Sequence, residues 1–434
     1  MLLRYALYSC GVMSIKLPPF CVSLRKRRAD YPRGEILPSC ARRELCYNKA
    51  ENKKRTGRGA ERMKPLGLYI HIPFCKAKCI YCDFYSLPRA EEQMDAYVAA
   101  LRRDIAQKAE AAGSYTVDTV YFGGGTPSYL GAERLAAVLE TIFAHYHVSA
   151  DAEITTEANP DSAREERSLR HLREAGFNRI SLGMQSACDE ELRRIGRVHT
   201  HEETISAVKS ARAAGFDNVS LDLIYGLPGQ TSTRWEENLR AAIALAPEHL
   251  SCYGLKVEEG TPLYEKRSAM HLPDDDVQAE EYLFTVETLD KAGYRQYEIS
   301  NFARPGRESR HNLKYWTMQE YLGFGPGAHS DFGGRRFACA RDLGAYLAGK
   351  ALLSESYCPP EREREEERVM LALRTAAGLD LTALKEDTAQ AGAVLEECAR
   401  HGLARKEGGR WRLTPQGFLV SNAVIVRLLE ALAL

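Results

Sequence analysis

The sequence of 434 residues has no net charge, no long hydrophobic run and only one pair of cysteines with C-x2-C spacing. Its 59 lysines and arginines are balanced by 59 acidic residues, so the simplest argument for nucleic-acid binding is excluded. No stretch approaches the roughly 18 apolar residues that a transmembrane helix needs. With 44% hydrophobic and 27% charged residues, the composition is that of a folded globular protein.

The charge is unevenly distributed along the chain. Residues 1–64 hold 16 lysines and arginines but only 5 acidic residues, and the remainder carries the opposite excess of 11. This arginine-rich segment predicts either a targeting extension of the mitochondrial type or an upstream extension that is not made, with Met63 as the real start. The second reading is favoured, because MKPLGLYIHIPF begins directly on a strand. We expect a cytoplasmic protein, or a mitochondrial one if residues 1–64 are a transit peptide.

Short β-rich runs alternate with helical stretches over residues 65–303. Such alternation predicts right-handed βαβ crossovers and a parallel sheet. Six or seven consecutive units, with glycine or polar groups at the strand ends, favour an α/β fold of the partial TIM-barrel type. The expected strands are 67–74, 117–125, 152–160, 178–186, 218–228, 249–257 and 294–303.

The character of the chain changes after residue 303. Residues 304–359 are expected to be a connecting segment, rich in glycine and aromatics and without a clean period. Residues 360–434 begin with a highly charged helix, and Gly408–Gly409 predicts a hairpin turn followed by a closing helix over 419–433. This pattern indicates a small helical, winged-helix-like domain. Its charges nearly cancel, so DNA binding is not expected.

Three cysteines directly after the first predicted strand carry the strongest chemical signal. Cys75, Cys79 and Cys82 have C-x3-C-x2-C spacing, and a loop this short can wrap three thiolates around one face of an iron–sulfur cube. The fourth iron is then left for another ligand. Zinc is the alternative, but a structural zinc site usually takes four protein ligands and no second C-x2-C pair is present. The spacing also favours a reducing compartment over a disulfide framework.

The cysteine loop, its position after the first strand and the glycine-rich stretch after the second strand resemble the radical S-adenosylmethionine (SAM) superfamily. In that family the open iron of a [4Fe–4S] cluster is chelated by the amino and carboxylate groups of SAM. One electron from the reduced cluster cleaves SAM to methionine and a 5′-deoxyadenosyl radical. The resemblance therefore implies that the protein positions and shields a reactive cofactor.

The resemblance also implies that the strand ends hold SAM. Glycine after the second strand would allow close approach of the backbone to the ligand. Glu157 would accept both ribose hydroxyls, and Arg197 would form a bidentate pair with the SAM carboxylate. An acid inside a strand, such as Asp222, is costly unless it faces a polar site. The expected SAM contacts are Tyr69, Tyr81, Gly124, Gly125, Thr126, Glu157, Gln185, Arg197 and Asp222.

Over about residues 66–430 the chain more closely resembles one branch of this superfamily, the oxygen-independent coproporphyrinogen III oxidases. The matching runs are YIHIPFC, GGGTP, RISLGMQS and LDLIYGLPGQT. The oxidases carry a fourth cysteine two residues after the third, and Phe84 occupies that position here. They also carry a longer N-terminal segment, which residues 1–64 do not match. Oxidative decarboxylation of coproporphyrinogen III is therefore the alternative function, and enzymatic activity is left open.

The Cys-Asp-Phe form of the loop resembles the heme chaperones of the same branch. These share the signature H-N-x-x-Y-W, present here over residues 311–316. Histidine is a good ligand of heme iron, and tyrosine and tryptophan offer flat apolar faces. The resemblance implies that heme is held through His311 and passed to acceptor hemoproteins, including those of the respiratory chain. A packing or capping motif is the alternative, and His329 is a second candidate ligand.

Overall fold

Seven parallel strands form the centre of a twelve-stranded sheet in the computed structural model, which describes residues 63–350 and 352–434. Both faces of these strands are largely buried, as expected when helices cover a parallel sheet. The parallel strands of the sequence prediction are confirmed for the first six. They are β1 (Lys64–Ile72), β4 (Tyr115–Gly124), β5 (Val148–Ala158), β6 (Arg179–Gln185), β7 (Val219–Tyr225) and β8 (His249–Gly254).

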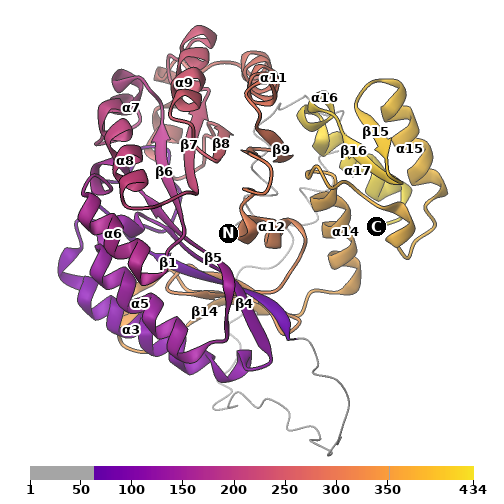
Figure 1. Ribbon diagram of the computed structural model, residues 1–434. Helices are drawn as coiled ribbons and strands as arrows, with labels where there is room; N and C mark the ends of the chain where they lie inside the picture. Colours follow the sequence, from indigo (N-terminus) through magenta and orange to yellow (C-terminus); the bar gives the residue numbers. More distant parts are fainter. Residues whose placement is uncertain (1–62, 351) are drawn as a thin grey trace, which may run out of the picture. The chain divides into compact units, whose positions relative to one another are not determined.

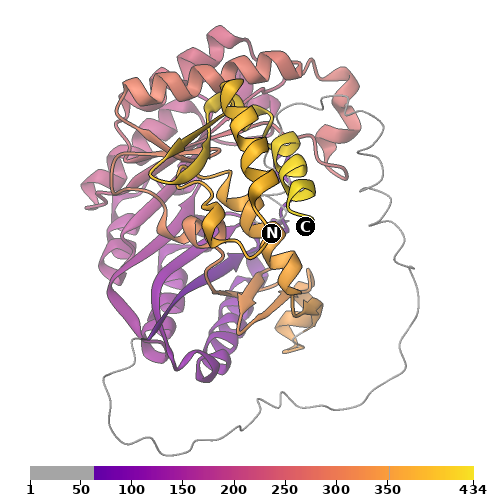
Figure 2. The same cartoon turned by 90° about the vertical axis from the view of Figure 1, so that its right-hand side faces the viewer.

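Helices follow these strands in the chain and lie along the outer side of the curved sheet (Figures 1 and 2). Several begin at a side-chain cap, such as the capping box of Thr200 and Glu203. The longer helices are α3 (Met94–Lys108), α5 (Ala132–His145), α6 (Glu166–Ala175), α8 (His201–Ala213), α9 (Ser232–Ala244) and α11 (Asp275–Lys291). Short elements in the loops are β2 (Phe74–Cys75), β3 (Leu87–Pro88), α4 (Pro127–Leu130), α7 (Asp189–Arg194) and α10 (Pro262–Lys266).

The seventh predicted strand is wrong as a parallel strand. Residues 294–303 form a hairpin of β9 (Arg295–Glu298) and β10 (Asn301–Ala303), and β10 runs antiparallel to β8. The chain reverses where the Glu298 carboxylate accepts the Ser300 N–H at 2.9 Å. The run of βα units therefore ends at β8, and the barrel is partial.

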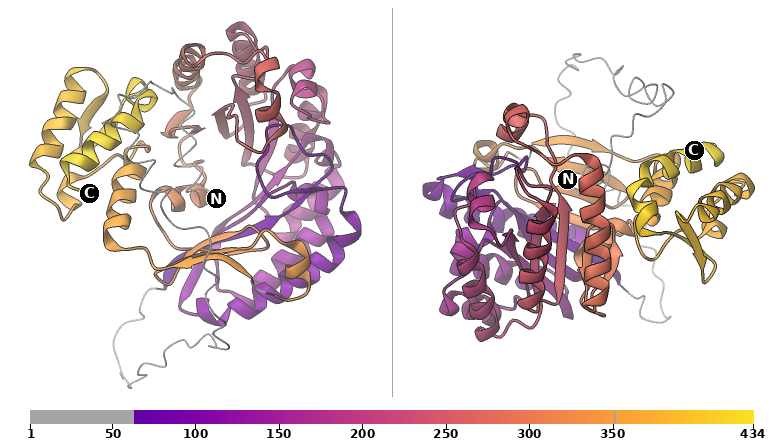
Figure 3. Two further views of the ribbon diagram at one scale, coloured as in Figure 1. Left: turned by 180° about the vertical axis from the view of Figure 1, so that it is seen from behind. Right: turned by 90° about the horizontal axis from the view of Figure 1, so that it is seen from above.

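Residues 304–359 extend the sheet on its other side, although the sequence indicated only a connecting segment. After α12 (Arg310–Trp316), β11 (Tyr321–Phe324) pairs in parallel with β1. Three antiparallel strands then complete the sheet, namely β12 (His329–Phe332), β13 (Arg335–Cys339) and β14 (Leu353–Tyr357), with α13 (Leu343–Leu347) between the last two. Figure 3 shows these orange strands beside β1. The order is β14-β13-β12-β11-β1-β4-β5-β6-β7-β8-β10-β9.

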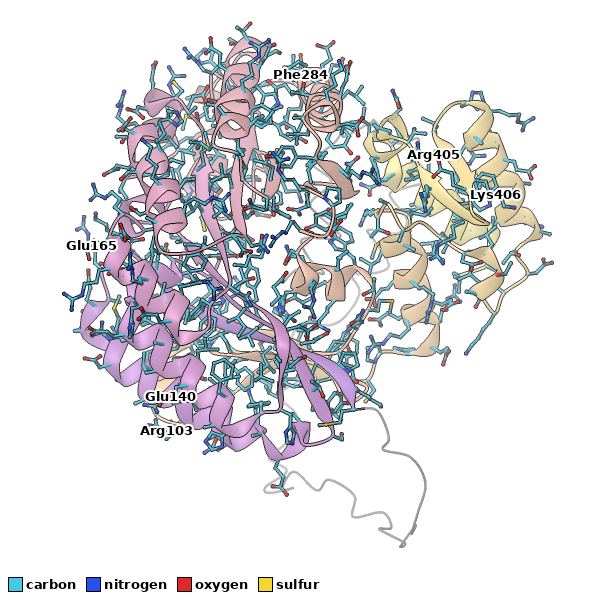
Figure 4. The ribbon with its side chains drawn as sticks, viewed as in Figure 1. Arg103, Glu140, Glu165, Phe284, Arg405 and Lys406 are labelled. Atoms are coloured by element: carbon cyan, nitrogen blue, oxygen red, sulfur yellow. The ribbon has the colours of Figure 1, made fainter. Side chains whose placement is uncertain are left out.

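The C-terminal residues form a small helical domain with a hairpin, as predicted. Its elements are α14 (Glu361–Ala372), α15 (Ala389–Arg400), β15 (Ala404–Glu407), β16 (Arg410–Leu413), α16 (Pro415–Leu419) and α17 (Ser421–Ala431). Gly408 and Gly409 both have positive φ, as a two-residue hairpin turn requires. Arg405 and Lys406 lie on the hairpin (Figure 4), where Arg405 pairs with Glu407 at 2.9 Å.

The prediction for the basic N-terminal extension falls on residues outside the described part, apart from Met63 and Lys64. In the part of the chain that is described, none of the helices has both the length and the apolar composition needed to cross a membrane.

Candidate cluster and cofactor site

The cysteine loop follows β1 and is closed at its base by β2 and β3. These short strands pair in parallel, and the Leu87 N–H donates to the Pro73 carbonyl over 2.6 Å. Cys75 is buried, whereas Cys79 and Cys82 are partly exposed. The loop therefore lies at the carboxyl end of β1, the end at which barrel active sites are built.

Burial and nearby hydrogen-bond donors have opposite effects on the thiols of this loop. Burial is the main cause that raises the pKa of Cys75, and it raises the pKa of Cys82 to about 12. Thr126 Oγ1 donates to Cys75 Sγ at 3.4 Å, and Arg197 Nη1 donates to Cys79 Sγ at 3.6 Å. Such donors favour the thiolate form, and the positive charge of bound metal would complete the ionisation.

The number and spacing of the thiols favour a cluster over a single zinc ion. A structural zinc site usually takes four protein ligands, and only three cysteines of the described chain line the cavity. A cube carries its irons on separate corners, so each of three thiolates from one short loop can hold a different iron. The donor set therefore fits a [4Fe–4S] cluster with one iron open.

Packing of the protein itself requires the two glycines at the end of β4. Gly124 has a φ of +112°, and a Cβ there would collide with the His71 ring. A Cβ on Gly125 would lie 2.8 Å from the carbonyl oxygens of both Ile72 and Phe74. The backbone of this turn thus crosses directly over the start of the cysteine loop, and glycine is needed to let the two segments touch.

Gly125→Ala is expected to reduce cluster content and to lower the unfolding temperature, because the new methyl group meets fixed backbone atoms. Gly392→Ala is the matched control. Gly392 lies inside α15, and a Cβ there has only ordinary contact at 3.9 Å. That change should stabilise the protein by about 1 kcal/mol. Iron analysis and thermal unfolding of both variants provide the measurement, and an unchanged Gly125→Ala protein would contradict this account.

A polar network links the strand ends to the loop. Asn159 Nδ2 donates to Thr126 Oγ1 at 3.2 Å, and Asn159 Oδ1 accepts from Arg197 Nη2 at 2.6 Å. Arg197 Nη2 also donates to the Gly183 carbonyl at 2.9 Å. Among the described residues no carboxylate lies within 4.0 Å of this guanidinium to form an ion pair. Asn159 was missed by the sequence reasoning, although its position in Glu-Ala-Asn-Pro, directly after β5, is a signal that could have found it.

The acidic residues of the strand ends are held by neutral donors. Glu157 accepts from the Tyr121 hydroxyl at 2.8 Å and from the Gly124 N–H at 3.1 Å, and burial raises its pKa to about 7. Asp222 accepts from Ser181 at 3.1 Å and Ser251 at 2.7 Å, and burial raises its pKa as well. Both carboxyls can therefore change protonation or partner when a ligand enters.

Three further predicted residues lie near the loop. Gln185 has a φ of +61°, a strained conformation for a residue other than glycine, of the kind often found at functional sites. The Tyr69 hydroxyl lies 3.0 Å from His71 Nδ1. Tyr81 packs against a small apolar cluster that includes Ile195.

Helix α12 carries the His-Asn-Leu-Lys-Tyr-Trp segment and begins on the Glu153 carboxylate, which accepts two of its first N–H groups at 3.0 Å each. His311 is buried. Its Nδ1 lies 2.8 Å from Thr119 Oγ1, and its Nε2 lies 2.8 Å from the Tyr315 hydroxyl. His311 and Tyr315 are four residues apart and therefore share one face of the helix.

The expectation that the tryptophan of this segment offers a face to a macrocycle is wrong. Trp316 is five positions after His311, about 140° around the helix, and it packs in the hydrophobic core instead. Lys314 is a packing residue as well, because its Nζ forms an ion pair with Asp118 at 2.7 Å. The segment thus combines cavity-facing and packing residues.

One cavity brings together all the residues that the sequence predicted for the site. Its lining includes the three cysteines, the nine expected SAM contacts, His311 and also His329, whose Nδ1 lies 3.2 Å from Glu355 Oε1. Phe84 lines it beside the loop. Asn312 and Tyr315 of the H-N-x-x-Y-W signature line it as well. The lining also includes residues that the sequence reasoning did not identify, namely Tyr121, Asn159, Arg179, Ser181, Ser251 and Tyr253.

Two family models match the chain. The radical SAM superfamily matches residues 69–242, and the HemN C-terminal domain matches residues 360–420. The heme chaperone HemW of Bacillus subtilis is 37% identical over 371 residues, which cover 82% of this chain and 97% of that protein. HemW of Mycobacterium tuberculosis is 39% identical over 376 residues, which cover 84% and 95%. A mitochondrial protein of Bos taurus, radical S-adenosyl methionine domain-containing protein 1, is 41% identical over 272 residues, about 60% of each chain.

A solved structure of a radical SAM protein is also similar to this chain. Coproporphyrinogen III oxidase HemN from Escherichia coli, a radical SAM enzyme, superposes with a TM-score of 0.74 at 25% sequence identity, covering 84% of this chain and 90% of that one. Radical SAM proteins as a class use a [4Fe–4S] cluster and SAM. On the extent of these matches, the chain belongs to the HemW family of heme chaperones, within the radical SAM superfamily.

Proposed function

We propose that this chain binds a [4Fe–4S] cluster, SAM and heme in its central cavity and delivers the heme to acceptor hemoproteins, including those of the respiratory chain. The observation that carries the proposal is the position of His311, which lines the same cavity as the three cysteines. The family membership supports the heme-chaperone role. The phenylalanine at position 84, in place of a fourth cysteine, supports transport of heme over synthesis of its precursor.

The state of His311 suits iron ligation. Burial is the first cause that lowers its pKa, to about 3, so the imidazole is neutral at physiological pH, the form that binds a metal. The rings of Tyr69 and Tyr121 stack against the His311 ring, with centroid distances of 6.5 and 5.2 Å. The Tyr315 hydroxyl is hydrogen-bonded to His311 Nε2. Ligation of iron through this nitrogen therefore requires the Tyr315 side chain to rotate away.

The cluster and SAM have their own residues in the proposal. Cys75, Cys79 and Cys82 would hold three irons, and Arg197 would bind the SAM carboxylate, since it has no carboxylate partner in the described chain. Glu157, at the end of β5, would accept the ribose hydroxyls. Together the cluster and SAM supply one-electron chemistry when they are bound. The protein residues orient SAM and keep water from the open iron.

Heme titration of the wild type and of His311→Ala tests the proposal. The variant is expected to lose the absorption band of histidine-ligated heme and to bind heme at least about tenfold more weakly. His329→Ala is the control, because His329 also lines the cavity but is engaged with Glu355, and it should bind heme as the wild type does. Equal heme binding by His311→Ala and wild type would show that the assigned site is wrong.

The alternative function is oxidative decarboxylation of coproporphyrinogen III, which the similarity to HemN favours. The same preparations should be incubated without oxygen with dithionite, SAM and coproporphyrinogen III. The proposal expects no CO2 and no protoporphyrinogen from protein with a fully loaded cluster. Product formation would instead support an enzyme of the oxidase type.

A further inference from the structure

Arg179 is a buried positive charge on the wall of the cavity to which neither the sequence reasoning nor the proposed function assigns a role. It is the first residue of β6, and its side chain is only 1% exposed. After Trp235 it is the largest of the fully buried side chains of the described chain. It lines the cavity that also contains the cysteine loop and His311.

No group of the described chain accepts a hydrogen bond from this guanidinium. Its Nε is buried without a partner, and no carboxylate among residues 63–350 and 352–434 lies within 4.0 Å of it. Three carboxylates interact with Arg179 through their charge but are hydrogen-bonded to other groups. Glu153 accepts two backbone N–H groups of α12, Glu157 accepts one hydroxyl and one backbone N–H, and Asp222 accepts from two serines.

Arg336 shows what a buried arginine normally has. It is 7% exposed, and it donates to the carboxylates of both Asp331 and Glu367. A guanidinium carries five donors in a planar fork, and each needs an acceptor once water is removed. Because the protein offers acceptors to Arg336 but not to Arg179, the acceptor for Arg179 must come from water or from a ligand. A carboxylate matches the geometry of the fork.

We propose that Arg179 binds a propionate carboxylate of the porphyrin enclosed in this cavity and so orients the macrocycle at His311. The inference rests on the proposed heme function, and it goes further by naming the group of the ligand that is recognised. Arg179 is therefore a substrate-binding residue, and heme whose propionates are blocked should be discriminated against.

The strand register places Arg179 at the level of His311. Tyr69, Tyr121, Thr155 and Arg179 are direct neighbours in one row across four parallel strands. The His311 ring stacks on the two tyrosines of this row, and Thr155 Oγ1 is a second buried polar atom without a partner. Two strand spacings, about 9.6 Å, separate the backbones of Tyr121 and Arg179. A macrocycle held at His311 can span that width with a propionate side chain.

The carboxylate of SAM is the other candidate partner of Arg179, but we expect it to bind Arg197 instead. Arg197 contacts Gly183 and the cysteine loop. Gly183 is four residues beyond Arg179 on β6, about 13 Å along the strand. A carboxylate at the cluster is therefore too far from Arg179 to be shared.

The experiment uses the full chain with an anaerobically reconstituted cluster and three probes: heme, heme dimethyl ester and SAM. The wild type should bind heme about tenfold or more tightly than the diester, and Arg179→Met should bind both equally, having lost the interaction with a charged group. Arg179→Lys should recover part of the preference, since it keeps the charge without the fork. Arg179→Met should unfold at nearly the same temperature as the wild type, because Arg179 has no hydrogen-bond or ion-pair partner within 4.0 Å in the described chain.

Any of the following results would contradict the inference. If Arg179→Met retains the preference for free heme while His311→Ala loses heme, the inference is wrong and the proposed function stands. If Arg179→Met weakens SAM binding and leaves the heme preference intact, the carboxylate bound is that of SAM. A markedly lower unfolding temperature of Arg179→Met would assign the residue a structural role. A wild type that binds neither porphyrin would overturn both the proposed function and the inference.

Discussion

Replacing Cys79 with alanine is expected to leave the anaerobically reconstituted protein without its [4Fe–4S] cluster. Each thiolate of the loop would hold a separate iron, and the loss of one leaves two irons without a protein ligand. Of the cysteines in the described chain, only those at 75, 79 and 82 line the cavity, so no replacement ligand is at hand. Iron and acid-labile sulfide analysis, with the electron paramagnetic resonance spectrum of reduced protein, measures the loss.

Cys358→Ala is the matched control for this experiment. Cys358 is exposed and is not part of the cavity lining, so its removal should leave iron and sulfide at wild-type levels. Full cluster content in Cys79→Ala would show that the loop is not the ligand set. Wild-type protein that contains zinc and no acid-labile sulfide would revive the zinc interpretation.

Arg336→Ala is expected to lower the free energy of unfolding by about 3–5 kcal/mol, as the removal of one partner from a buried ion pair generally does. Arg336 on β13 donates to Asp331 on β12 at 3.0 Å and forms a two-nitrogen contact with Glu367 on α14. Arg364, also on α14, binds the same aspartate with distances of 2.5 and 2.6 Å. This cluster joins the sheet to the C-terminal helices, and the substitution leaves the buried Glu367 carboxylate without its arginine partner. Chemical denaturation of wild type and variant measures the change.

Arg335→Ala provides the comparison on the same strand. Arg335 is exposed and bonds Ser356 on the neighbouring strand at 2.9 Å, so its removal should change stability by less than about 1 kcal/mol. A double-mutant cycle of Arg336→Ala and Glu367→Ala should show strong coupling, because the two side chains are in direct contact. Additive effects in that cycle would contradict the assigned contact.

The elements that were predicted correctly are those with local causes. Alternating strands and helices produced six of the seven parallel strands, and two adjacent glycines with positive φ produced the hairpin at residues 408–409. The elements that were missed depend on distant pairing. Strand β11 forms because it pairs with β1, about 250 residues earlier in the chain, and no period within residues 304–359 reveals that partner. The charged run correctly predicted a helix, α14, but its spacing along the chain does not reveal that Glu365 and Glu367 are buried.

By itself the sequence determined the cysteine loop and its C-x3-C-x2-C spacing, because the three thiols lie within eight residues of one another. It also determined the family, through runs of residues at successive strand ends. Only the tertiary structure decided that His311 shares a cavity with that loop, that Trp316 does not, and that Arg179 has no protein partner. The physical reason is that burial and pairing of a charge depend on distances between side chains from different strands and helices, and spacing along the chain does not set those distances.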